Sequence, residues 1–115
     1  MRLKSEIWVK AYVRRCFSEG VPAMILRRGQ SDAGAIFIKV SRLDGSALVL
    51  GPAPAGFEEM SSDRRWVLCH GDDPMSDADA DAYLGRQTDF DTDIWVIEIE
   101  DREGRHFLDD AICQF

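Results

Sequence analysis

The segment AIFIKVSRLDGSALVL, residues 35–50, places an Asp-Gly pair between two apolar runs. In the first run, branched apolar residues recur at every second position, which is the period of a β-strand; they are Ile36, Ile38 and Val40. Asp44-Gly45 is suited to the positive φ angles that tight hairpin turns require. We therefore predict a β-hairpin with strands at residues 35–40 and 47–50.

The flanking segments extend this hairpin in both directions. A further apolar run at residues 23–28 precedes it across the polar loop 29–34, and we predict that the three runs form an antiparallel meander. On the other side, residues 51–56 contain Pro52 and Pro54, which cannot donate to a ladder. The chain is therefore predicted to leave the sheet at residues 51–56.

Two helices are predicted from spacing and cap signals. The first runs from about residue 6 to 18, with Ser5 as its cap and with Gly20 and Pro22 as stop signals. The second runs from Ser76 to about residue 86, because a serine followed by acidic residues complements a helix N-terminus.

Three more strands complete the predicted fold, at residues 65–70, 94–100 and 105–108. The last two form a second hairpin around residues 101–104. The predicted fold class is α+β, with two helices packed against a mostly antiparallel sheet of about five strands. The length of 115 residues predicts a single domain, residues 1–115.

The composition indicates a cytoplasmic globular protein. The chain is 45% hydrophobic and 30% charged, and no apolar run reaches the roughly 20 residues of a membrane helix. Its start lacks the apolar stretch of a signal peptide. The cysteines are odd in number and widely spaced, which does not fit a disulfide framework; they are Cys16, Cys69 and Cys113. We predict no membrane contact.

The net charge of −7 is unevenly distributed along the chain. Residues 1–42 hold nine basic residues against three acids and carry +6, whereas residues 43–115 carry −13. An acidic total disfavours nucleic acid as the main partner, because phosphate contacts need positive potential. A local basic face in the first third is still compatible with an anionic partner.

Common catalytic, metal and cofactor motifs are absent from the sequence. It contains no G-x-S-x-G elbow and no glycine-rich phosphate loop. No pair of Cys or His residues has zinc-site spacing. The aspartate runs at residues 77–81 and 89–93 lack the glycine of a calcium loop. We therefore predict no catalytic residue, no metal and no cofactor.

The most informative polar groups are two arginine pairs, Arg14-Arg15 late in the first helix and Arg27-Arg28 before the loop 29–34. The guanidinium fork matches carboxylates and phosphates. The loop glycines can leave backbone N–H groups open to an anion. Alternatively, the arginines pair with this protein's own acids, such as Asp32 or those between residues 72 and 93.

Trp66 follows two arginines and is predicted to lie at the rim of a partner surface. The candidate binding residues are Arg14, Arg15, Arg27, Arg28, Asp32 and Trp66.

A resemblance to one family is carried by several segments: LKSEIWV at 3–9, RRG at 27–29, DAGAIFI at 32–38, GPAP at 51–54, IWVIEIED at 94–101 and RHFL at 105–108. Together they resemble an alphaproteobacterial family catalogued as domain of unknown function 1491. The resemblance implies a bacterial, stand-alone, cytosolic protein and brings no assigned activity and no site residue.

These features favour a small, non-catalytic, cytosolic binding module that contacts an anionic partner through the basic region at residues 27–34. One alternative is a small enzyme acting on an anionic metabolite, with His70 or His106 transferring protons near neutral pH. Another is a nucleic-acid accessory protein, which the acidic C-terminal part disfavours. A concave site that joins arginine, histidine and carboxylate would favour the enzyme.

Overall fold

The computed structural model describes residues 2–54 and 64–113. Within these residues, two helices and six strands follow one another, and a 3₁₀ turn follows them. Their bounds are α1 Ser5–Ser18, β1 Ala23–Arg27, β2 Ile36–Ser41, β3 Ser46–Pro52, β4 Trp66–Asp72, β5 Met75–Ser76, α2 Asp77–Phe90, β6 Trp95–Glu100 and η2 Asp109–Ala111. The sheet order is β1-β6-β2-β3-β4, and β5 pairs with β3.

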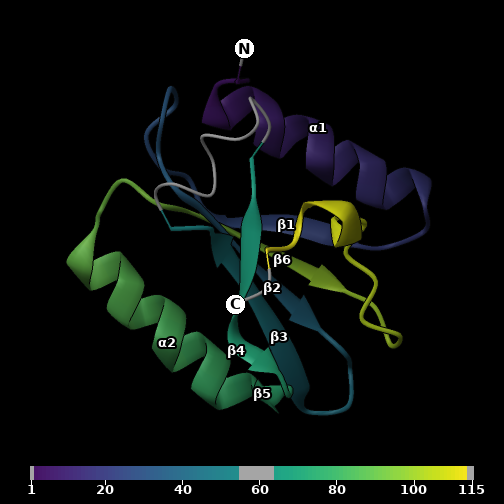
Figure 1. Ribbon diagram of the computed structural model, residues 1–115. Helices are drawn as coiled ribbons and strands as arrows, with labels where there is room; N and C mark the ends of the chain where they lie inside the picture. Colours follow the sequence, from purple (N-terminus) through teal and green to yellow (C-terminus); the bar gives the residue numbers. More distant parts are fainter. Residues whose placement is uncertain (1, 55–63, 114–115) are drawn as a thin grey trace.

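The sheet lies between the two helices, as Figure 1 shows, and each helix covers its own core. The core under α1 includes Val9, Tyr12, Ile38, Trp95, Ile97 and Ile99. The core under α2 is smaller and includes Phe37, Val49, Ala80, Leu84 and Val96. All strand pairs are antiparallel except β2 with β6. The predicted α+β class, with a mostly antiparallel sheet and two helices, is confirmed.

The hairpin predicted around Asp44-Gly45 joins β2 to β3, and Val40 faces Leu48 in its register. Its turn has Gly45 at φ 87°, a conformation that glycine adopts without a Cβ penalty. The Asp44 carboxylate stabilises the turn by accepting bonds from the backbone N–H and hydroxyl of Ser46. Because these contacts are local, the sequence alone is enough to predict the turn.

The predicted three-strand meander is wrong, because β6 inserts between β1 and β2. It runs antiparallel to β1 and parallel to β2. The loop between β1 and β2 passes over the start of β6, where a Cβ on Gly29 or Gly34 would collide with the Asp93 carbonyl oxygen. These two glycines therefore let the β1–β2 loop pass close to the backbone at the start of β6, an arrangement that hairpin rules do not predict.

Three local predictions also need correction. Residues 105–108 are not a strand, because the Asp101 carboxylate accepts from the backbone N–H and guanidinium of Arg105 and closes a turn instead. Ser5 is the first helical residue, and its hydroxyl donates to the Gly34 carbonyl oxygen at 2.6 Å. Pro52 stays in the sheet opposite Trp66, because at a strand end its missing N–H interrupts little of the ladder. Residues 55 and 56 of the predicted exit lie outside the described residues.

The second helix begins as predicted. The Ser76 hydroxyl accepts a hydrogen bond from the Asp79 N–H at 3.1 Å, and α2 then continues to Phe90. The strand at Trp66–Asp72 also agrees with its prediction to within two residues at either end.

Candidate functional site

The first predicted binding element, Arg27-Arg28, makes its contacts within the fold. Arg27 Nη2 donates to the Thr92 carbonyl oxygen at 2.7 Å. Arg28 Nη2 lies 2.8 Å from Glu6 Oε1, and its guanidinium lies 5.5 Å from the centroid of the Trp95 ring. Both arginines thus have partners within this protein, while their role in binding stays a prediction.

The loop after these arginines uses its own donors. The side-chain oxygen of Gln30 accepts from the backbone N–H groups of Asp32 and Ala33, at 3.1 and 2.6 Å. Two loop carbonyl groups accept from N–H groups in the first turn of α1. The Asp32 carboxylate lies 3.6 Å from Lys4 Nζ. The loop therefore joins the start of α1 to the sheet, and these donors are already engaged.

A different region forms a basic hollow, which we call the α1 pocket. It lies between α1, the start of β4 and the segment around η2, and its volume is about 400 Å³. Its basic lining residues are Arg2, Arg15 and Arg64, and its aromatic lining residues are Trp8, Trp66 and Phe107. Asp110 is the acid among the described lining residues. Two of the predicted binding residues, Arg15 and Trp66, meet here.

Aromatic rings form the inner wall of the α1 pocket. Trp8 stacks on Tyr12 with ring centroids 4.9 Å apart, and Trp66 lies 5.0 Å from Trp8 at 39°. Trp66 is only 2% exposed, so its predicted position at a rim is wrong. The chain near Ile112 pairs with it and buries it. Its ring supports the pocket from below.

Two arginines are held over this pocket by separate contacts. The Arg15 guanidinium lies 5.5 Å from the centroid of the Phe107 ring, within the range of a cation–π interaction. Arg64 Nη2 donates to the Leu3 carbonyl oxygen at 2.9 Å and lies 3.2 Å from the Ser5 hydroxyl. Because these residues come from distant parts of the chain, sequence patterns do not reveal that they converge.

Phe107 has the rare positive φ of 63°. For a residue with a Cβ this left-handed conformation is strained, and such strain clusters at functional sites. The neighbouring His106 is buried, and burial lowers the pKa of its imidazole. Its Nδ1 accepts from the Leu108 N–H, and its carbonyl oxygen accepts from the Tyr12 hydroxyl. His106 therefore shapes the Phe107 turn from behind the pocket.

A second hollow of about 270 Å³, the α2 pocket, lies between β4 and α2. Its polar lining residues are Cys69, His70, Asp79, Tyr83 and Arg86. Burial raises the pKa of the Cys69 thiol, which disfavours the thiolate form. Burial, together with the hydrogen bond to Cys69, raises the pKa of Tyr83 to about 12. The α2 pocket thus joins arginine, histidine and carboxylate without an activated nucleophile.

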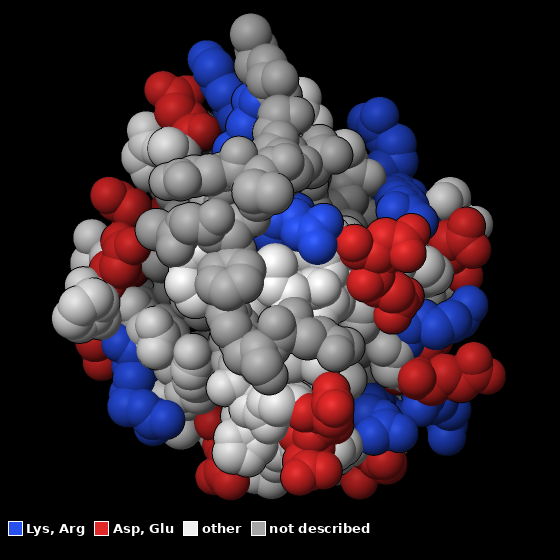
Figure 2. Space-filling model, viewed as in Figure 1, with Lys and Arg blue, Asp and Glu red and all other residues white. Residues whose placement is uncertain are grey.

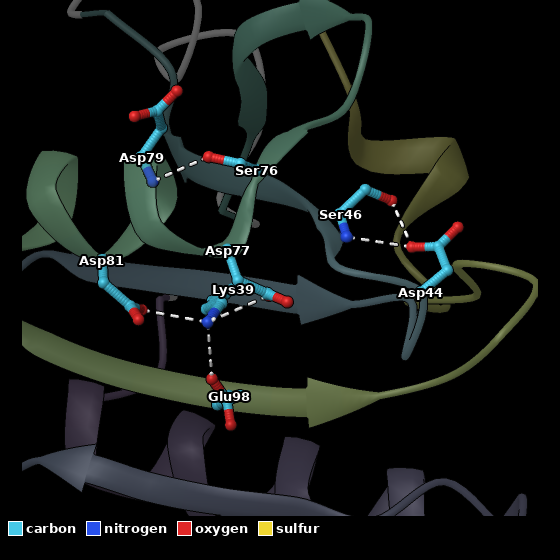
Figure 3. Close-up of polar contacts among 8 residues, drawn as sticks. All are labelled: Lys39, Asp44, Ser46, Ser76, Asp77, Asp79, Asp81 and Glu98. Carbon is cyan, nitrogen blue, oxygen red and sulfur yellow. Dashed lines mark hydrogen bonds and ion pairs between the residues drawn. The ribbon is translucent and has the colours of Figure 1, made fainter.

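The densest charge cluster surrounds Lys39 on β2, under α2 (Figure 3). Lys39 Nζ lies 2.9 Å from Asp81, 3.1 Å from Glu98 and 3.3 Å from Asp77. Its side chain is 6% exposed. Burial alone lowers the pKa of Lys39, but its bonds to the three carboxylates outweigh burial and raise it. The ammonium group fills the space between the carboxylates, so this cluster fastens α2 to the sheet.

The Lys39 cluster joins the basic and the acidic parts of the chain. Lys39 belongs to the basic part of the chain, and all three of its partners belong to the acidic part. Figure 2 shows basic and acidic side chains interleaved over one face of the molecule. Within residues 2–54 and 64–113, no cluster of three or more His, Cys, Asp or Glu side chains is arranged to hold a metal ion.

Two helices on a mixed six-stranded sheet, with a basic pocket backed by aromatic rings, define a small α+β protein with a concave candidate ligand site. Residues 3–109 match the family model described as "Protein of unknown function (DUF1491)". The chain belongs to this family, as the resemblance of its segments predicts. The family description assigns no activity.

Solved structures of similar proteins share the fold. The crystal structure of a DUF1491 family protein from Caulobacter crescentus CB15 has a TM-score of 0.80 and 37% identity, covering 99% of this chain and 100% of that chain. An NMR structure of a DUF1491 family protein from the same organism has a TM-score of 0.79 and 38% identity, covering 99% of each chain. The solution structure of Atu0922 from A. tumefaciens has a TM-score of 0.75 and 38% identity, covering 87% of this chain and 86% of that one.

Comparison with curated proteins gave no match. Within the described ranges, 2–54 and 64–113, neither helix is long and apolar enough to span a bilayer.

Proposed function

We propose that this protein is a non-catalytic cytosolic binding module that holds an anionic partner in the α1 pocket. The observation that carries the proposal is the position of Arg15, whose guanidinium lies at a concave site backed by Trp8, Trp66 and Phe107. Arginine pairs well with carboxylates and phosphates, and it does so more strongly where a pocket excludes water. The free thiols of all three cysteines support a reducing, cytosolic setting.

The proposal shifts the expected contact from the loop 29–34 to the other side of the α1 N-terminus. The loop donors described above are engaged within the protein, and Arg28 is paired with Glu6. Arg15 lines the pocket, whereas its neighbour Arg14 lies on the exposed side of α1 and does not. Because Arg14 and Arg15 carry the same charge and differ in position, replacing each in turn tests whether lining the pocket decides binding.

The test is native mass spectrometry on the protein isolated gently from its own cells, as wild type, Arg15→Glu and Arg14→Glu. We expect the wild type and Arg14→Glu to retain an added mass that Arg15→Glu loses. A third variant, Arg28→Glu, tests the loop and is expected to keep the mass. Circular dichroism melts establish that all four proteins are folded. Loss of the mass from Arg28→Glu but not from Arg15→Glu would move the site back to the loop.

An enzyme acting on an anionic metabolite is the second candidate. The α2 pocket favours it, because His70, Arg86 and Asp79 line one hollow. The test is turnover of a panel of phosphate and carboxylate esters by the wild type, with His70→Asn and Arg86→Met as controls. Turnover that both variants abolish would support the enzyme. A protein that turns over nothing, or whose turnover survives both changes, would contradict it.

A further inference from the structure

We infer that the ligand of the α1 pocket is a small organic anion that carries a planar ring, with the ring against the tryptophans and the anionic group at Arg15. This inference rests on the proposed function and specifies its ligand class. It joins two features of one hollow, the aromatic wall and the guanidinium at its edge.

The size and shape of the hollow favour a small molecule over a protein surface. Its volume of about 400 Å³ falls within the range of small-ligand pockets, roughly 300–1,000 Å³. An adjoining hollow of about 190 Å³ shares Arg2, Arg64 and Trp66 with it and extends toward Ala33. A protein partner, in contrast, typically covers about 800 Å² on each side, most of it flat.

The wall of the pocket is suited to a flat ring. Trp8 and Trp66 contact each other at 39° with ring centroids 5.0 Å apart, and both line the hollow, so a ligand ring meets the parts of these rings that face the hollow rather than a gap between them. Phe107 also lines the hollow, and its φ of 63° holds the residue there at a conformational cost. Aromatic groups favour edge contacts as well as offset stacks, and the aromatic lining offers ring edges for such contacts.

The anionic group of the ligand binds at Arg15. Arg15 is exposed, lies over the Phe107 ring and makes no ion pair within the described residues. A planar guanidinium donates two parallel hydrogen bonds to a carboxylate or a phosphate while its face stays on the ring. Ring and anion are therefore recognised side by side, and a ligand that has both should bind better than either part.

The experiment follows the three indole N–H signals by NMR during titration with 2-naphthyl phosphate, 2-naphthol and inorganic phosphate. Trp8 and Trp66 line the pocket, whereas the Trp95 indole donates to the Gln30 carbonyl oxygen away from it and serves as an internal control. We expect saturable shifts of Trp8 and Trp66 with 2-naphthyl phosphate at a Kd at least about tenfold lower than with either half. Arg15→Glu should weaken binding about tenfold, and Arg14→Glu should leave it unchanged.

Each other outcome overturns the inference in a recognisable way. If phosphate alone binds as tightly as 2-naphthyl phosphate, the ring is not recognised, although the anion site of the proposed function stands. If all three indole signals shift together, binding is not at this pocket. If no probe shifts Trp8 or Trp66 while the native protein keeps an added mass that depends on Arg15, the ligand class is wrong and the proposed function survives.

Discussion

Replacing Lys39 by methionine is the sharpest test of how the fold is held together. Methionine keeps the apolar stem that packs under α2 and removes only the ammonium group. The three carboxylates around Lys39 Nζ then face one another without a cation. Breaking a buried ion pair costs about 3–5 kcal/mol, whereas an exposed pair contributes about 0–1 kcal/mol.

The exposed fraction of each carboxylate decides whether the loss of stability in Lys39→Met lies nearer the value for a buried pair or the value for an exposed pair. Glu98 is 21% exposed and is mostly shielded from water, whereas Asp81 is 62% exposed and its pair contributes little. The Glu98 pair therefore dominates, and we expect Lys39→Met to lower the free energy of unfolding by about 2–3 kcal/mol. Because the pKa of Lys39 is raised in the folded state, its contribution is complete below its ordinary value of 10.5 and is lost only as the pH rises above that.

Urea denaturation at pH 7 measures this change. With a slope of about 1–3 kcal/mol per molar urea, the midpoint should fall by about 0.7–3 M. Lys4→Met is the matched control, because Lys4 pairs with Asp32 at 3.6 Å on the surface and should change stability by less than about 0.5 kcal/mol. The double variant Lys39→Met/Glu98→Gln should recover about half of the loss. If Lys39→Met and Lys4→Met have the same midpoint, the ion cluster does not fasten α2 and the reasoning is refuted.

Three further predictions concern the backbone and pH. Gly34→Ala should lower the free energy of unfolding, measured by urea denaturation, by at least about 2 kcal/mol, because its Cβ meets the Asp93 carbonyl oxygen. The control is Gly85→Ala in the open face of α2, which should raise the free energy of unfolding by about 0.5–1 kcal/mol. Equal effects of the two changes would contradict the close approach of the 29–34 loop to the start of β6. Phe107→Gly should be at least as stable in thermal melts as Phe107→Ala, because only glycine adopts φ 63° without strain; a clearly less stable glycine variant would argue against strain. Burial lowers the pKa of His106, so its stabilising contribution is present above about pH 6.5 and is lost as the pH falls below that. Urea midpoints between pH 7.5 and 5.5 should therefore fall less in His106→Asn than in the wild type, and equal slopes would contradict this role of His106.

The parts of the fold that sequence predicts are those decided within a few residues. The Asp44-Gly45 turn closes by bonds between neighbours, and the Ser76 cap reaches only to Asp79. The insertion of β6 between β1 and β2 depends instead on a contact between Gly34 and Asp93, which are far apart in the chain. Turn residues mark where strands end, but they do not state which strand comes next in the sheet.

The residues of the candidate site also divide into those that stand out in the sequence and those that only the fold brings together. Sequence analysis singled out Arg15 and Trp66 individually, because arginine pairs and tryptophans stand out by type. Arg64 and Phe107 do not stand out in this way, since a basic residue just before a predicted strand and an aromatic residue within one have ordinary local explanations. The detectable signal at Phe107 is its φ of 63°, and this is a property of the fold rather than of any sequence pattern.

The positive charges of the first third of the chain have unequal opportunities to bind an outside partner. Lys39 is enclosed by three carboxylates, and Arg28 already has Glu6 and the Trp95 ring as partners, so an added anion would have to displace contacts that stabilise the fold. Arg15 lies over an aromatic ring, which leaves its hydrogen-bond donors available at the edge of a hollow. We therefore expect an anion to bind more tightly at Arg15 than at the loop, because at Arg15 it does not displace a contact within the protein.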